Sequence, residues 1–251
     1  MLRVVSRLAI VLALAAGTGW GPAWAAPIAP GFDLFHTPPF VSPFLSAAFG
    51  QPVELVGKPI DPPGLGNTDT IVERLGGLPA GATGPIPTEL VALSLQSVSP
   101  IQIQGSFFDV FVSINQLGLP GILQPLPPPP STGEILLITH DDVAGSGTFD
   151  SFFDVFANVT LVDPQTEQIV DTEIVQLPLS NQGATWSHNP PPGYPSDPRF
   201  PPGGFFPGPI DHRGEHPVVP AVPEPATLLL LGLGLAGTVA AFARNRHPRR
   251  P

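Results

Sequence analysis

The sequence contains no cysteine, which excludes disulfide cross-links and thiol chemistry. Any folded domain must therefore be held together by its own hydrophobic core. The roughly 200 residues between the two terminal segments described below are enough to form one.

Basic residues are also scarce, and most of them lie at the two ends of the chain. Six of the ten lysines and arginines lie in the terminal segments, so the region between them carries four basic residues against 20 acidic ones, a formal net charge of −16. A surface this acidic repels nucleic acid and anionic lipid. We expect neither as a partner.

Catalytic motifs are lacking as well: the sequence has no Gly-x-Ser-x-Gly elbow, no P-loop and no dinucleotide-binding fingerprint. We therefore predict that the body is not an enzyme and carries no cofactor. The nearest candidate site is His140-Asp141-Asp142, followed by a glycine-rich loop and Asp150. Clustered carboxylates on such a loop can bind Ca²⁺.

This cluster lacks the spacing of an EF-hand, so an ordinary hairpin turn is the favoured interpretation. Whether Asp141, Asp142 and Asp150 bind Ca²⁺ stays open, and a metal-dependent enzyme using His140, Asp141 and Asp142 is the weakest alternative. His212 and His216 have a spacing that chelates a metal only on a helix, and the neighbouring glycine and prolines predict a loop.

An uncharged apolar segment follows a short proline-containing motif in the last thirty residues. Residues 226–243 would form a helix about 27 Å long, close to the roughly 30 Å core of a bilayer. We predict one transmembrane helix there. The basic residues that follow are expected to remain cytoplasmic as a stop-transfer cluster: Arg244, Arg246, Arg249 and Arg250.

The motif, the apolar segment and the basic tail together resemble the PEP-CTERM protein-sorting signal of exported bacterial proteins. The residues of the motif are Val222, Pro223, Glu224 and Pro225. The resemblance, which covers residues 222–251, implies recognition by an exosortase, a membrane cysteine protease, with cleavage near the motif. It also implies a Gram-negative host that makes exopolysaccharide or biofilm matrix.

The other end of the chain has the pattern of a signal peptide. Arg3 and Arg7 precede the apolar residues 8–16, and Ala23-Trp24-Ala25 fits the small-x-small rule for cleavage by signal peptidase after Ala25. We therefore expect a precursor anchored in the inner membrane with its body in the periplasm. The mature protein is then expected at the cell surface or outside the cell.

The middle of the chain shows the alternation of apolar and polar residues that is typical of half-buried strands. Val91, Leu93 and Leu95 alternate with smaller or polar residues, and the segment from Phe108 to Ile114 alternates in the same way. We predict a mainly antiparallel β domain over 85–180.

The same region contains an internal repeat. Ser-Phe-Phe-Asp-Val-Phe occurs at 106–111 and again at 151–156, and the preceding residues 89–94 and 134–139 match at the same offset. A duplicated hairpin unit, 87–114 and 132–159, predicts a sandwich-like domain with pseudo-symmetric halves, and a small barrel also fits the pattern.

One face of each repeated strand mixes aromatic and acidic residues. Aromatic rings can stack on sugars while carboxylates accept hydrogen bonds from hydroxyls, so a carbohydrate-binding surface is one hypothesis. The favoured alternative is that protein covers both faces, because tryptophan and tyrosine, the usual sugar-stacking residues, are scarce. The residues concerned are Phe107, Asp109, Phe111, Phe152, Asp154 and Phe156.

The flanking regions are rich in proline. Residues 26–84 are expected to wrap or precede the β domain, and residues 181–221 to form a semi-rigid spacer, part of which packs back through its aromatic residues. The sequence as a whole predicts an exported surface or matrix protein associated with exopolysaccharide or biofilm. Signal peptidase and an exosortase are its processing partners, and exopolysaccharide is a candidate ligand.

Overall fold

The computed structural model describes residues 26–60, 65–141, 144–192, 194 and 197–208. Within these residues the protein is mainly β, and every pair of neighbouring strands is antiparallel. The predicted antiparallel β class is confirmed. The strands join one continuous 11-stranded sheet.

The elements follow one another along the chain in a simple order. They are β1 (Gly31–Phe35), β2 (Phe40–Val41), α1 (Pro43–Phe49), β3 (Glu54–Gly57), β4 (Thr70–Arg74), β5 (Gly84–Ser97), β6 (Ile101–Ile103), β7 (Ser106–Asn115), β8 (Ser131–Asp141), β9 (Ser146–Val162), β10 (Ile169–Ser187) and β11 (Phe206–Pro207).

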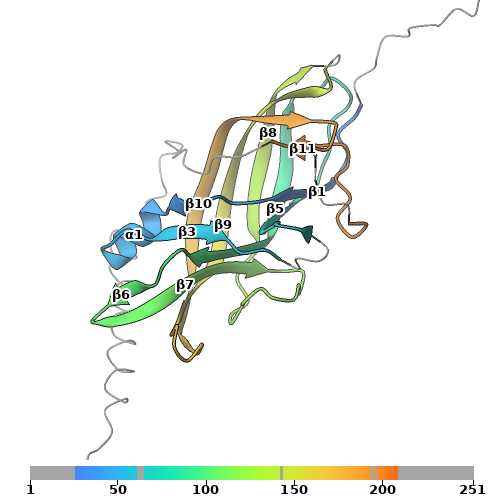
Figure 1. Cartoon of the computed structure of the whole chain (residues 1–251). Helices are drawn as coiled ribbons and strands as arrows, with labels where there is room; N and C mark the ends of the chain where they lie inside the picture. The colour runs from blue at the N-terminus through green and yellow to red at the C-terminus, as the bar shows by residue number, and fades with distance from the viewer. Residues whose placement is uncertain (1–25, 61–64, 142–143, 193, 195–196, 209–251) are drawn as a thin grey trace, which may run out of the picture.

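The main path through the sheet is β1-β4-β5-β7-β9-β10-β11. Strands β7 and β8 share the space between the two long strands β5 and β9: β8 pairs with the first half of each, and β7 with the second half. The sheet curls on itself, so that β1, β3 and β7 run across the long strands β8, β9 and β10 in Figure 1.

A segment without regular structure closes the curled sheet. The backbone N–H groups of Ala29 and Phe32, on the free side of β1, donate to the carbonyls of Gly203 and Pro201 at 2.9 Å. A few residues later the same segment forms β11 against the end of β10. Both edge strands therefore gain hydrogen bonds that an open sheet would leave unmade.

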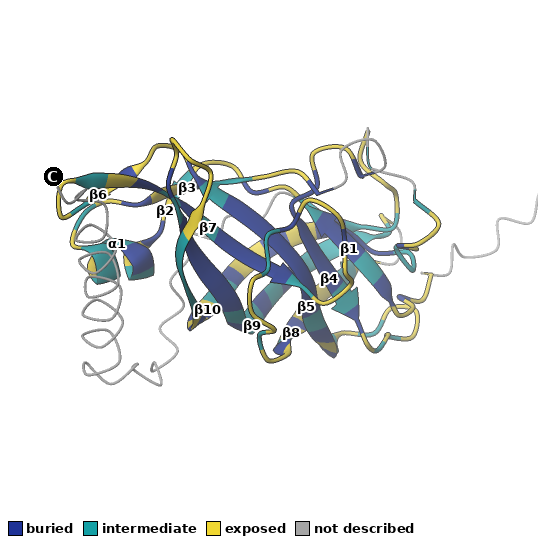
Figure 2. Cartoon of the chain, turned by 90° about the horizontal axis from the view of Figure 1, so that it is seen from below, coloured by how far each residue is buried: buried dark blue, intermediate teal, exposed yellow. Residues whose placement is uncertain are grey.

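Apolar residues on the concave side of the sheet form most of the core. One cluster includes Leu93, Val112 and Val159 near the middle strands, and another includes Ile135, Phe149 and Trp186 at the far end. A third cluster lies on the outer side of β4 and β5, under loops that include Leu119 and Phe200. Strands β5 and β7 are accordingly largely buried in Figure 2, while the connecting loops are exposed.

The repeated sequence forms two hairpins, β5–β7 and β8–β9, which differ in register. Leu93 pairs with Ile114 in the first, but the equivalent Ile138 lies at a bulge between Leu137, which pairs with Phe149, and Thr139. In the first hairpin β6 follows β5 and the chain turns at Gln104 and Gly105, with φ of 50° and 86°, whereas in the second hairpin the turn follows Asp141, which pairs with Ser146. Positive φ at both central residues is typical of a type I′ turn.

The helix α1 was not expected from the sequence. Ser42 caps its N-terminus by accepting a hydrogen bond from the Leu45 N–H at 3.2 Å, Pro43 occupies the first turn, and Gly50 ends it in the left-handed conformation. This proline-at-the-start and glycine-at-the-end pattern is readable from sequence, but seven residues give too little periodicity to reveal the helix.

The sheet extends beyond the interval predicted for the β domain. Strands β1 to β4 lie before residue 85, and β10 and β11 continue past residue 180. Among the described residues no helix is both long enough and apolar enough to cross a bilayer. The predicted span, 226–243, lies outside those residues.

Candidate functional site

The residues predicted to direct sorting and processing all lie outside the described part of the chain. These are Ala23 and Ala25, the motif Val222, Pro223, Glu224 and Pro225, and the cluster Arg244, Arg246, Arg249 and Arg250.

The acidic residues of the predicted calcium loop are not brought together. Asp141 lies opposite Ser146, whereas Asp150 lies four residues further along β9, which corresponds to about 13 Å of strand. The Asp141 carboxylate accepts a hydrogen bond from the Ala144 N–H, and the Asp150 carboxylate accepts one from the Gly183 N–H. Asp142 lies outside the described residues.

The mixed aromatic and acidic face is partly covered. Phe107 is 57% exposed, while the other five residues of this face are half-buried. The ammonium group of Lys58 lies 4.9 Å from the centre of the Phe111 ring, and partial burial raises the pKa of Asp109. The expectation that protein covers this face thus holds only in part, because Phe107 projects into solvent.

A small cavity of about 30 Å³ lies within the concave side of the sheet. Its walls are almost entirely apolar and include Phe35, Val72, Leu90, Ile135, Phe153 and Leu179. Ligand pockets are typically about 300 Å³ or larger, so this cavity has no room for a sugar or an organic cofactor. It is a packing gap between the two core clusters on the concave side of the sheet.

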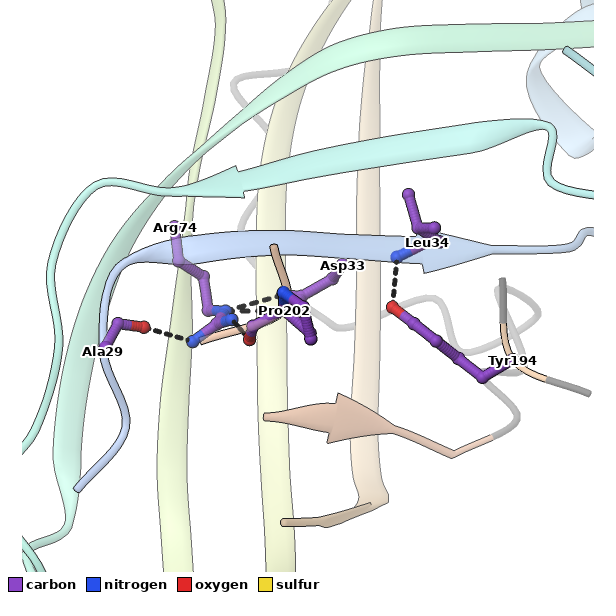
Figure 3. A network of polar contacts seen from close by, with 6 residues as sticks. All are labelled: Ala29, Asp33, Leu34, Arg74, Tyr194 and Pro202. Atoms are coloured by element: carbon purple, nitrogen blue, oxygen red, sulfur yellow. Dashed lines mark hydrogen bonds and ion pairs between the residues drawn. The ribbon is translucent and has the colours of Figure 1, made fainter. Parts of the chain in front are cut away.

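A fully buried ion pair joins β1 to β4, and its arginine also contacts the proline-rich segment. The Arg74 guanidinium donates to both carboxylate oxygens of Asp33 at 3.0 and 3.1 Å, and also to the carbonyls of Ala29 and Pro202. Figure 3 shows the Arg74 side chain reaching all three partners. Loss of hydration raises the pKa of Asp33 to about 7, although Arg74 acts in the opposite direction.

Tyr194 forms a second contact between the same regions. Its hydroxyl accepts a hydrogen bond from the Leu34 N–H at 3.1 Å, as Figure 3 shows, and burial raises its pKa to about 12. Together with the Arg74 contacts, this bond ties the segment after β10 back onto β1. These polar groups stabilise the closure of the fold.

His140, in β8, and His188, which directly follows β10, meet at one end of the sheet. The Nε2 atoms of His140 and His188 are 3.2 Å apart. Both rings also pack edge-on against Trp186, with ring centres 4.9 and 5.0 Å away. Both imidazoles are half-buried, whereas the indole is buried and donates to the Thr139 carbonyl at 3.2 Å.

The local sequence explains how these rings come together. A bulge at Ile138 shifts the alternation of β8, so His140 lies directly opposite Gly147, which in turn lies opposite Trp186 on β10. A Cβ at residue 147 would lie 1.9 Å from the Thr139 carbonyl oxygen and 2.6 Å from the indole nitrogen. Only glycine therefore allows the three strands to pack this way.

The sequence indicated His140 as a candidate ligand together with Asp141 and Asp142, and the structure places His140 beside a second histidine. The partner supplied by the fold is His188, which is 48 residues away and belongs to no recognisable motif. The only local signals are the histidines and a glycine in a strand, and neither shows that two long strands bring the rings together.

Comparison with known proteins is informative for the C-terminal segment alone. The family described as the PEP-CTERM protein-sorting motif matches residues 221–246, which confirms the predicted resemblance. No curated protein and no solved structure matches the chain. The chain thus has the sorting segment of an exported protein that an exosortase processes, joined to an antiparallel β body.

Proposed function

We propose that the protein is a non-enzymatic component of the cell surface or extracellular matrix of an exopolysaccharide-producing bacterium. Signal peptidase removes its first 25 residues, the C-terminal helix holds the precursor in the inner membrane with the body in the periplasm, and an exosortase cuts near Glu224. The mature body is then released or attached outside the cell.

The observation that carries this proposal is the match of residues 221–246 to the sorting motif. The described body is consistent with a structural role. Its fully buried ion pair connects two parts of the backbone, its cavity is small and apolar, and its formal charge suits a soluble exported surface. The absence of recognisable catalytic motifs supports the non-enzymatic assignment.

Intact-mass measurement of the protein from cells with and without the exosortase tests this proposal. We expect wild-type protein to lose both the first 25 residues and the helix after the motif, and to keep the helix when the exosortase is absent. Glu224→Ala should behave like the exosortase deletion because it changes the motif alone.

Glu215→Ala is the matched control, since it removes a nearby carboxylate outside the motif and should be processed normally. Retention of the C-terminal helix in wild-type cells would show that the segment is a permanent anchor. Equal processing of the Glu224 and Glu215 variants would show that the motif is not what the protease reads.

The exposure of Phe107 favours a second candidate, a carbohydrate-binding module. Phe107 is 57% exposed on a face that also carries Asp109, an arrangement that allows ring stacking and hydrogen bonding to a sugar.

Binding to exopolysaccharide purified from the host should weaken at least about tenfold in Phe107→Ala if this ring is an anchor. Leu136→Ala, at an exposed apolar position of β8, is the control. Unchanged affinity in both Phe107→Ala and Phe152→Ala would remove this candidate.

A further inference from the structure

His140 and His188 form a pair whose outer nitrogens are both fixed by backbone carbonyls. His140 Nδ1 lies 3.3 Å from the carbonyl oxygen of Ala82, and His188 Nδ1 contacts the carbonyl oxygen of Gly204. A carbonyl oxygen only accepts, so each Nδ1 must carry the proton. In the neutral form of both rings, both Nε2 atoms then present lone pairs.

These two lone pairs face one another across 3.2 Å. Two acceptors at this distance repel unless a positive charge lies between them or beside them. The arrangement is therefore favourable only when the two nitrogens share a cation, which is either a proton on one ring or a metal ion bound by both. The packing of both rings against Trp186 keeps them in this orientation.

We propose that His140 and His188 bind one divalent transition-metal ion, of the Zn²⁺ type, through their Nε2 atoms. Zn–N bonds of about 2.0–2.1 Å at a tetrahedral angle place two nitrogens roughly 3.4 Å apart, close to the separation seen here. Metal-binding histidines commonly donate their other ring N–H to a carbonyl, as both rings do. This site goes beyond the sorting function proposed above and does not depend on it.

The donor set also defines which ions are suitable. Imidazole nitrogens suit Zn²⁺, Cu²⁺ and Ni²⁺, whereas Ca²⁺ and Mg²⁺ prefer oxygen ligands. The described residues contain no group of three or more His, Cys, Asp or Glu side chains that could hold a metal ion. Water is therefore expected to complete the coordination, which gives an exchangeable ion and not one required for folding.

Titration of the full-length protein with ZnCl₂ by calorimetry at neutral pH tests the proposal. We expect one site in the wild type and a loss of affinity of at least about tenfold in either His140→Gln or His188→Gln. The double variant should be no weaker than each single variant, because removal of either ligand already abolishes chelation. CaCl₂ should show no binding that depends on these histidines.

Two controls separate this pair from the other histidines. His36→Gln removes an imidazole that contacts Asp69 instead, and His212→Gln/His216→Gln removes the two in the proline-rich segment. Both variants should still bind Zn²⁺ as the wild type does. Binding that is unchanged in the His140 and His188 variants, or that is lost in the His212/His216 variant, would overturn the proposal.

A measurement on the unmodified protein covers the case in which a variant does not fold. Long-range ¹H–¹⁵N NMR of the imidazoles should show that added Zn²⁺ shifts Nε2 of both histidines while Nδ1 stays protonated. Spectra that change with pH but not with Zn²⁺ would show that the pair shares only a proton, and would refute metal binding.

Discussion

The buried pair of Asp33 and Arg74 connects separate segments of the fold, but the burial of its charged groups also costs free energy. The guanidinium satisfies the carboxylate and two backbone carbonyls, so each of these buried acceptors has a partner. Burial nevertheless raises the pKa of Asp33 to about 7 from its ordinary 3.8. The folded protein thus binds a proton more tightly than the unfolded chain does.

We therefore predict that Asp33 makes the protein less stable as the pH rises from about 4 to about 7. Between these values the folded state holds more protons than the unfolded state, so the free energy of unfolding falls with pH by at most about 1.4 kcal/mol per unit from this group. Urea unfolding at several pH values should show this slope in the wild type, and a smaller slope in Asp33→Asn.

Other groups titrate over the same pH range. The test is therefore the difference between the stability–pH profiles of the wild type and of Asp33→Asn. Glu54→Gln removes an exposed carboxylate and should leave the wild-type slope in place. If Asp33→Asn and Glu54→Gln change the pH profile equally, the raised pKa of Asp33 is refuted. A uniform loss of stability in Asp33→Asn is expected in addition, since Arg74 is then left without its buried partner.

At the scale of elements, the segment 201–208 behaves as part of the sheet although it contains only two strand residues. Phe205 is fully buried, stacks on Trp186 with ring centres 5.2 Å apart, and contacts Phe149 and the Arg74 guanidinium. This one side chain therefore joins the closing segment to β9, β10 and β4.

We predict that Phe205→Ala lowers the free energy of unfolding by about 3–5 kcal/mol, because it leaves a cavity beside Trp186. Chemical unfolding monitored by the fluorescence of Trp186 measures this change. Phe107→Ala makes the same substitution at a ring that is 57% exposed, and should cost less than about 1 kcal/mol. Equal costs at the two positions would show that the closing segment does not contribute to the core.

The sequence predicts the strands that alternate but not the segments that complete the sheet. The periodicity of 108–114 correctly identifies the apolar face, since Phe108, Val110, Val112 and Ile114 are all buried. Residues 201–203 show no such pattern, because their place depends on hydrogen bonds to Ala29 and Phe32, about 170 residues earlier. Long-range pairing of this kind leaves no local signal.

The candidate functional residues likewise include some that the sequence reveals locally and some that only the fold brings together. The sorting motif is a local pattern and is found both by inspection and by its match to residues 221–246. The histidine pair is not local, because it requires the bulge at Ile138, the glycine at 147 and the end of β10 together. The sequence indicated His140 through its acidic neighbours, whereas the fold places it beside His188.

At the scale of the whole molecule, the sorting motif and the folded body occupy separate parts of the chain. Residues 221–246 match a sorting motif shared among proteins, whereas the buried clusters that define the body are drawn from residues 28 to 205. The sequence of the sorting motif and the sequence of the body can therefore change independently of one another. A match to the motif carries little information about the body in front of it.

The closure of the sheet by residues 201–208 also sets the order in which an exported chain can fold. An N-terminus-first passage through a translocation channel delivers β1 early, but its outer edge gains partners only when Pro201 and Gly203 emerge. Almost the whole body must cross before its first strand is protected, so folding is completed late and through contacts of high sequence separation. Until then β1 has a bare edge, at which a neighbouring chain could pair. A membrane segment that holds each chain at its C-terminal end during this interval would keep such chains apart while the last strand arrives.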